Sequence, residues 1–322
     1  MKTIFIAASG LIIVIGSYCI NPVITTAVLS SAIRHSTPLV LGALCGLVGE
    51  RAGVMNIGIE GQMLISAFIG FCVNAWINNL FVAVIAGVAT GAFAGLFLAF
   101  MSVSLRVDQI IAGSVINIMA LGLTGYFYQV GMTATGKLQA VTIPILSKIP
   151  LFGPLLFIIP PITFITIILV FLFHFLLFKT AWGLRIRATG EYPKAAATMG
   201  INVYLIRYSS VIIGGALAGL AGVYLSLEAV GIFERGMING RGFIALAVMI
   251  FGRWTPFGAW GAALLFGLAS ALQTQLQFGG NINIPHQFIG MLPYVITIIA
   301  LALFFGRNRP PAALGKPYRE EE

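Results

Sequence analysis

The polar side chains that could do chemistry in this chain are few, and they lie inside long apolar segments. Asn56 and Glu60 lie in a glycine-rich stretch that begins at Gly49, and Asn117 lies in the middle of a later apolar segment. Amides and a carboxylate in an apolar surrounding can bind the polar groups of a small solute. Polar groups inside membrane segments commonly mark a solute pathway. The sequence therefore predicts substrate contacts at Asn56, Glu60 and Asn117.

Two of these positions have a simple geometric interpretation. Asn56 and Glu60 are four residues apart, so on a helix through both they would share one face. Asn117 has a second interpretation, in which its amide only bridges two helices. Glu50 beside Arg51 favours a charge pair at the membrane interface over a substrate site.

Arg34 is a weaker candidate for substrate contact. A charge inside a span costs about 2.5–3.5 kcal/mol on insertion scales, so Arg34 should face protein or water. Pro38 removes one helical hydrogen bond, which favours a discontinuous helix lining a pathway. In the other interpretation the helix starts near Ser36, and Arg34 lies at the outer interface.

A third polar stretch precedes a very short apolar run. The run 243–251 would span only about 14 Å as a helix, well below a hydrocarbon core of about 30 Å. We expect a helix break at Gly240, Arg241 and Gly242, with the polar residues in protein or in a water-filled vestibule. The alternatives are one continuous tilted helix from about Met237 and an ordinary outer loop.

Residues 185–207 form a polar stretch between two apolar segments, so they are expected at the membrane surface. Pro193 suits a first helical position, strong helix formers follow, and Gly200 can close the helix. A short surface helix of this kind is a docking element for a soluble partner, with Ala196 on the expected contact face. The predicted docking residues are Glu191, Pro193, Ala195, Ala196, Thr198 and Gly200.

Composition places the chain in a bilayer. Of its 322 residues, 59% are hydrophobic and 8% are charged, far below the charged share of soluble domains. Its basic residues are scattered singly at helix ends, so the net charge of +9 does not indicate nucleic-acid binding. The three cysteines lack metal-ligand spacing and are expected to be core thiols. The sequence contains no Walker loop, zinc-protease motif or nucleophile elbow, so neither ATP binding nor catalysis is expected of this chain.

The predicted fold is all-α, one polytopic membrane domain over 1–322, with some broken or half-helices. About ten hydrophobic segments are expected at 3–20, 22–47, 55–77, 80–103, 108–129, 154–178, 206–229, 242–252, 257–277 and 287–306. Residues 179–206 are the predicted cytoplasmic loop, and 307–322 are a cytoplasmic tail whose acidic end is solvated. Segment 3–20 is expected to be an uncleaved helix, because it lacks a clear signal-peptide cleavage site.

Charge asymmetry predicts the orientation. With Lys2 inside, most of the 18 lysine and arginine residues fall on the inner side. The exceptions outside are Lys137, Lys148, Arg235 and Arg241. Both termini are therefore expected in the cytoplasm. The glycine repeats 87–91–95 and 215–219 place small residues on one helical face, where two backbones can approach closely.

Several stretches resemble the permease subunits of bacterial ATP-binding cassette (ABC) importers, in the branched-chain amino acid and simple-sugar family, and most resemble nucleoside-type permeases. They are residues 50–63, 183–201, 216–222 and 240–256, in the family's order along the chain. The first is the family's glycine-rich segment and the second its coupling-helix loop. The added first apolar segment departs from some relatives.

This resemblance implies a multi-pass subunit of the bacterial inner membrane that moves nucleosides, or related simple sugars, by alternating access. It implies a cytoplasmic ATPase subunit that binds the ATP, a second and non-identical permease, and an extracytoplasmic binding lipoprotein. No cofactor, metal or nucleic acid is implied for this chain. The alternatives from the residues alone are an ion-coupled secondary carrier and, with less support, a membrane-embedded enzyme.

Overall fold

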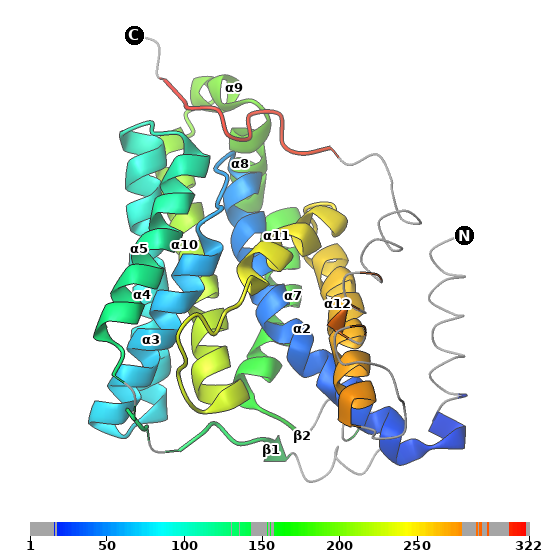
Figure 1. Ribbon diagram of the computed structural model, residues 1–322. Helices are drawn as coiled ribbons and strands as arrows, with labels where there is room; N and C mark the ends of the chain where they lie inside the picture. The colour runs from blue at the N-terminus through cyan, green and yellow to red at the C-terminus, as the bar shows by residue number, and fades with distance from the viewer. Residues whose placement is uncertain are drawn as a thin grey trace. The chain divides into compact units, whose positions relative to one another are not determined.

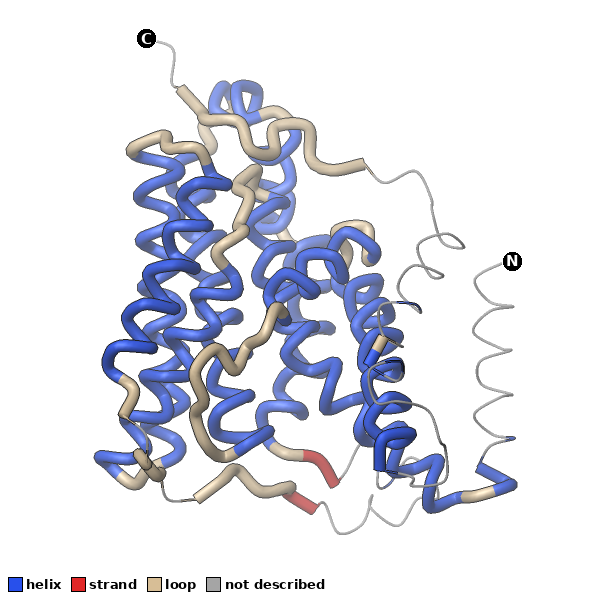
Figure 2. Tube along the Cα trace, viewed as in Figure 1, coloured by secondary structure: helices blue, strands red, loops and turns tan. Residues whose placement is uncertain are grey.

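A computed structural model describes residues 16, 18–129, 131–134, 136–142, 153, 155, 158–278, 288, 290, 291, 295 and 309–319. These residues are mostly helical, with only two short strands among them (Figures 1 and 2). The long helices are α2 (Pro22–Arg51), α3 (Ile59–Ile77), α4 (Leu80–Ala99), α5 (Gln109–Phe127), α7 (Pro161–Lys179), α10 (Val203–Val223) and α12 (Pro256–Phe278). The shorter ones are α8 (Ala181–Glu191), α9 (Pro193–Thr198) and α11 (Arg241–Phe251). The π-helical segments η1 (Phe100–Ser104) and η3 (Tyr224–Val230) extend α4 and α10, and β1 (Val141–Thr142) pairs antiparallel with β2 (Ile158–Ile159).

Within the described residues, seven helices are long and apolar enough to cross a membrane. They correspond to seven of the ten predicted segments, and α11 is the predicted short one. The predicted segments 3–20 and 287–306 lie almost wholly outside the described residues. The chain is thus a multi-pass helical membrane protein.

The chain divides into two compact units. One contains Met1–Ser36, Ala140–Phe164 and Leu264–Phe305, and the other contains Thr37–Gln139, Ile165–Ala263 and Gly306–Glu322. In the first unit, α2 and α12 approach closely, since a Cβ on Gly267 would lie 2.3 Å from the carbonyl oxygen of Ala32. The second unit holds α3, α4, α5 and α10 and most of the polar residues considered above.

The prediction that the second segment is broken near Pro38 is wrong. α2 is one helix of 30 residues with Pro38 inside it, so the alternative start near Ser36 is wrong as well. A proline removes one backbone hydrogen bond but keeps a helical φ. The residues from Ser36 to Gly49 are buried, and their packing stabilises the helix through this position.

Side-chain caps fix where several helices begin. The Asn79 carboxamide oxygen accepts hydrogen bonds from the first turn of α4, at 3.0 and 3.2 Å. Asp108 accepts from the first turn of α5 at 2.9 and 3.1 Å, and Asn202 accepts from Leu205 in α10 at 2.9 Å. Such caps satisfy amide groups that have no partner within the helix.

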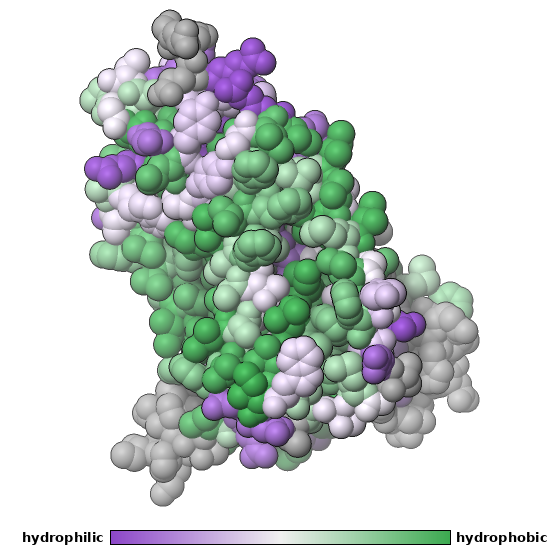
Figure 3. Space-filling view, turned by 90° about the vertical axis from the view of Figure 1, so that its left-hand side faces the viewer, coloured by the Kyte–Doolittle hydropathy of each residue, from purple (hydrophilic) through white to green (hydrophobic). Residues whose placement is uncertain are grey.

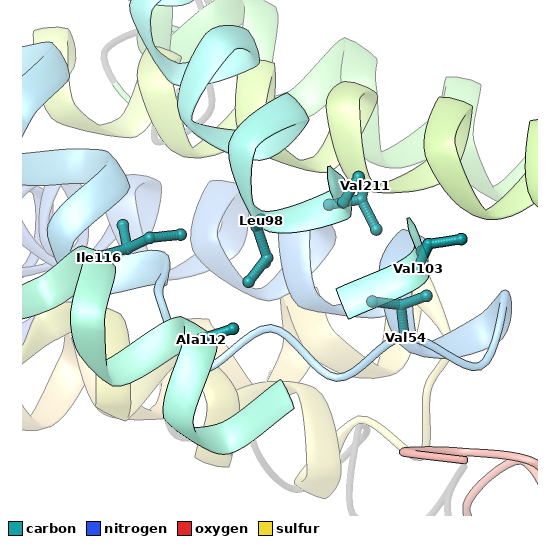
Figure 4. Packing of buried hydrophobic residues seen from close by; sticks show 7 residues of the cluster. Val54, Leu98, Val103, Ala112, Ile116 and Val211 are labelled. Atoms are coloured by element: carbon teal, nitrogen blue, oxygen red, sulfur yellow. The ribbon is translucent and has the colours of Figure 1, made fainter. Parts of the chain in front are cut away.

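The predicted close approach of the glycine repeats is confirmed. A Cβ on Gly91 of α4 would lie 2.3 Å from the carbonyl oxygen of Gly215 and 2.5 Å from the Cα of Gly219, both in α10. Beside this contact, a hydrophobic cluster joins α4, η1, α5 and α10 to the turn after α2 (Figure 4). Its members include Val54, Leu98, Val103, Ala112, Ile116 and Val211.

Replacing Gly91 with leucine should therefore destabilise the protein strongly. The side chain would meet backbone atoms of α10, which cannot rotate away, so α4 and α10 must separate. We expect a loss of about 3 kcal/mol, at the upper end of overpacking effects. Gly122→Leu on α5 is the control, because nothing lies within 4 Å of a Cβ there. Thermal unfolding in detergent measures both, and equal stability of the two variants would contradict the tight contact.

The surface of α4 and α5 is strongly apolar. Large side chains that point outward include Phe81, Phe93, Ile111, Ile118, Leu121 and Tyr126. In Figure 3, hydrophobic side chains cover the middle of this face, and hydrophilic ones lie toward its upper end and along its lower edge. This distribution is typical of a surface that contacts lipid or another membrane helix.

Candidate functional site

A side chain from α3 holds the start of α11. The two carboxylate oxygens of Glu60 accept hydrogen bonds from the backbone nitrogens of Gly240, at 2.8 Å, and Gly242, at 2.7 Å. Gly240 has a φ of +80°, and a Cβ on Gly242 would lie 2.6 Å from the Cα of Glu60. Amide groups at a helix N-terminus carry partial positive charge and have no partner in the helix. Glu60 supplies the matching negative charge.

The short eighth segment is a separate helix of 11 residues. Residues 235–240 form turns before it, so the alternative of one continuous helix from about Met237 is wrong. Arg241 is half-buried, and its Nη1 donates to the carbonyl oxygen of Met237 at 2.9 Å. Gly240, Arg241 and Gly242 thus mark the start of α11, and their place beside a water-filled vestibule stays a prediction.

Asn117 connects α5 to the start of α3. Its Oδ1 accepts a hydrogen bond from the backbone nitrogen of Gly61 at 2.7 Å, and its Nδ2 donates to the carbonyl oxygen of Ile57 at 3.1 Å. A Cβ on Gly61 would lie 2.7 Å from the Cα of Asn117, so the two backbones are close. These are the contacts of the helix-bridging interpretation. Asn117 is half-buried and lies beside the first turn of α3, which contains Glu60. Its contact with substrate stays a prediction.

Asn56 lies before α3, so the expected helical face shared with Glu60 is wrong. The glycine-rich stretch ends in a turn at residues 57–58, and the helix begins only at Ile59. Asn56 is 1% exposed, and its Nδ2 donates to Oε1 of Gln62 at 3.0 Å and contacts Sγ of Cys45 at 3.3 Å. Among the described residues, Oδ1 of Asn56 and Nε2 of Gln62 have no hydrogen-bond partner.

Two further sequence expectations have simple outcomes. Arg34 is exposed on α2, within the compact unit that contains Met1–Ser36, and its contact with substrate stays a prediction. Cys45 and Cys72 are buried thiols as expected, but Cys19 is exposed, so the core assignment is wrong there.

Sequence reasoning missed the contacts that fix the turn after α11. The indole nitrogen of Trp254 donates to Oε2 of Glu50 at 2.6 Å, and Nε and Nη2 of Arg51 donate to the carbonyl oxygen of Trp254 at 3.0 and 2.8 Å. Glu50 and Arg51 therefore each bind Trp254 instead of each other. Gln109 was missed too, and its Oε1 accepts from the backbone nitrogen of Met55 at 2.6 Å. No local pattern links residues so distant in sequence.

The predicted surface helix is present as α9. Pro193 is at its first turn, Thr198 is its last residue, and Gly200 follows with a φ of +76°. The predicted loop 179–206 also contains α8, which sequence reasoning missed because glycines disfavour helices. Both α8 glycines are needed for packing, since a Cβ on Gly183 would lie 2.2 Å from the Leu176 carbonyl oxygen. A Cβ on Gly190 would lie 2.1 Å from the Arg51 carbonyl oxygen.

Ala196 is not on the exposed face of α9, so its predicted role as a contact residue is wrong. It is 4% exposed and packs against Val203 and Tyr318. The side chains that α9 and its end expose are Lys194, Ala195, Thr198 and Met199. Glu191, at the end of α8, is exposed and accepts a hydrogen bond from the backbone nitrogen of Ala312 at 3.3 Å.

Comparison with known proteins gives consistent matches along the chain. The family described as "Branched-chain amino acid transport system / permease component" matches residues 28–301. A guanosine ABC transporter permease protein of Bacillus subtilis is 40% identical, covering 92% of this chain and 97% of that protein. A nucleoside ABC transporter permease protein of Lactococcus lactis is 38% identical, covering 90% and 96%. A putative glucose ABC transporter permease protein of Haloferax volcanii is 35% identical, covering 91% and 97%. No solved structure matches.

Proposed function

The chain belongs to the permease family of branched-chain amino acid transport systems, and on this premise we propose that it is the membrane-spanning subunit of an ATP-driven nucleoside importer. The observation that carries the proposal is identity of 38–40% to guanosine and nucleoside permeases over nearly the full length of each chain. As a permease subunit it is a translocation component and not itself an enzyme, so ATP hydrolysis belongs to a partner.

The proposed solute pathway runs past the start of α3. One carboxylate and two amides lie in this region, on Glu60, Asn117 and Asn56. The start of α11 lies beside them, because Glu60 binds the amides of Gly240 and Gly242. Such groups suit ribose hydroxyls and the edge of a base. A simple sugar is the second candidate substrate, because one relative is named a glucose permease.

The proposed assembly contains a cytoplasmic ATPase subunit, a second and non-identical permease, and an extracytoplasmic binding lipoprotein. Both termini and α9 are placed on the cytoplasmic side of the cell membrane, as the charge asymmetry predicts. The ATPase contacts the exposed side chains of Ala195, Thr198 and Met199. Closure of the ATPase dimer then shifts α9 and changes the side from which the pathway is open.

The substrate class is tested by competition. Uptake of labelled guanosine into proteoliposomes that hold the complete importer is measured with excess unlabelled adenosine, uridine or glucose. The proposal predicts competition by nucleosides and none by glucose. Competition by glucose with no effect of nucleosides would assign the chain to sugar transport.

Asn117→Leu tests the polar contacts at the start of α3. The substitution removes two hydrogen bonds and leaves the Gly61 amide and Ile57 carbonyl without their partner, which costs on the order of 1–3 kcal/mol. We expect uptake to fall about ten-fold at normal expression. Ser114→Ala, on the same helix, is the control, because its hydroxyl only bonds back to Ile110 within α5. Normal uptake kinetics in Asn117→Leu would contradict a role in the pathway.

A further inference from the structure

The C-terminal segment 309–319, here termed the strap, is bound along the end of the second unit that contains α8 and α9 (Figure 1). Three of its backbone amides make long-range hydrogen bonds, and that of Ala312 goes to the Glu191 carboxylate. Ala313 donates to the carbonyl oxygen of Gly190 in α8 at 2.9 Å, and Gly315 donates to that of Gly53, after α2, at 3.2 Å. The predicted tail is thus packed onto the protein in its described part. Its acidic end, 320–322, lies outside the described residues.

Arg207 of α10 binds the strap from inside the protein. Its Nη1 donates to the carbonyl oxygen of Lys316 at 3.0 Å, and the side chain is 1% exposed. A Cβ on Gly53 would lie 3.0 Å from Nη2 of Arg207 and 3.3 Å from the carbonyl oxygen of Ala313. Burying a guanidinium costs several kcal/mol unless it is well bonded. Among the described residues only Nη1 of this guanidinium has a hydrogen-bond partner, and Nε and Nη2 have none. Arg207 thus binds the strap to the first turns of α10, with the turn after α2 packed beside it.

The Tyr318 side chain forms the contact between the strap and α9. This side chain is 7% exposed and packs against Ala196 of α9 and Val203 of α10. Its ring lies 5.4 Å from the ring of Tyr204, in an edge-to-face arrangement. The side of α9 that is turned away from solvent thus rests on the strap.

We propose that the strap is a coupling element that transmits the displacement of α9 to the ends of α2 and α10. The six-residue α9 rests on the strap, because Ala196 packs against Tyr318. Tyr318 contacts α9 and α10, the Gly315 amide binds Gly53 in the turn that ends α2, and the Arg207 guanidinium binds the Lys316 carbonyl. Tyr318 and Arg207 are accordingly positioning residues for transport. The inference rests on the proposed docking of the ATPase at α9.

The test compares Tyr318→Ala with two controls in the complete importer. Tyr318→Phe keeps the ring, and Lys316→Ala removes an exposed side chain while keeping the carbonyl that Arg207 binds. Nucleoside uptake and ATP hydrolysis are measured together in proteoliposomes. We expect uptake per ATP hydrolysed to fall at least about ten-fold in Tyr318→Ala and to stay within about two-fold of the unmodified protein in both controls, with assembly retained.

A second variant, ending the chain at Pro317, removes Tyr318 and keeps the four long-range backbone hydrogen bonds of the strap, including that of the Lys316 carbonyl. It should show the same loss of uptake per ATP. Normal coupling in either variant would overturn the proposal, as would failure of both to assemble, because the strap would then serve folding alone. An unmodified protein that shows no ATP-driven uptake would instead overturn the proposed function.

Discussion

Glu60→Leu is expected to lower ATP-driven uptake by roughly 100-fold. The Glu60 carboxylate accepts two backbone hydrogen bonds that fix the start of α11, and hydrogen bonds to a charged group contribute about 1.5–3 kcal/mol each. A loss of about 3 kcal/mol from the states that carry substrate past α11 corresponds to roughly that factor in rate. Leucine has a similar size and no acceptor, so the Gly240 and Gly242 amides would lose their partner.

Glu60→Gln tests the loss of hydrogen bonds apart from a change in side-chain size, because glutamine is as large as glutamate. A carboxamide has one acceptor oxygen, so it can bind only one of the two amides, and an intermediate loss is expected. Glu234→Gln is the matched control, because Glu234 is exposed in the stretch that precedes α11. Initial uptake rates at equal amounts of assembled importer measure the effect. Normal uptake kinetics in Glu60→Leu would show that Glu60 has no role in the solute pathway.

Met199→Asp is expected to uncouple the ATPase with little effect on the fold. Met199 is 81% exposed at the end of α9, so a carboxylate there stays hydrated in the isolated subunit. In the docked complex it would lose its water in a contact surface, which costs several kcal/mol for a charged group, and substrate-stimulated ATP hydrolysis should fall at least about ten-fold. Met199→Leu keeps an apolar side chain and should behave normally.

Ala196→Asp provides the contrast on the same helix. Because Ala196 is buried against Val203 and Tyr318, the carboxylate would be buried without a partner, and the amount of folded protein should fall. The two variants thus separate loss of docking from loss of folding. Unchanged ATP hydrolysis in Met199→Asp, with normal assembly, would show that α9 does not receive the ATPase at this end.

The boundaries of α9 and α11 could be predicted because local chemistry sets them. Pro193 and Gly200 delimit α9, and Gly240, with its positive φ, precedes α11. The glycine repeats on α4 and α10 were predictable for the same reason, since spacing alone places them on one face. These features depend on residues close together in the sequence.

The positions of the residues that were assigned wrongly are set by contacts between distant parts of the chain. Which side of α9 is exposed depends on Tyr318, more than a hundred residues further on, so spacing could not place Ala196. A turn at residues 57–58 separates Asn56 from α3. The glycines of this stretch indicate that a turn can form, but they do not show at which residue it forms. The persistence of α2 through Pro38 reflects burial of the surrounding residues, which outweighs one lost hydrogen bond.

We expect this chain to move nucleosides only when a separate ATPase drives it. The most direct test is guanosine uptake into proteoliposomes containing this chain and its second permease, with binding protein, with ATP inside or outside, and with or without the ATPase subunit. We predict accumulation of guanosine against a gradient only when the ATPase is present and ATP is on the same side of the membrane as the ATPase. Accumulation driven by an ion gradient, without the ATPase, would contradict it.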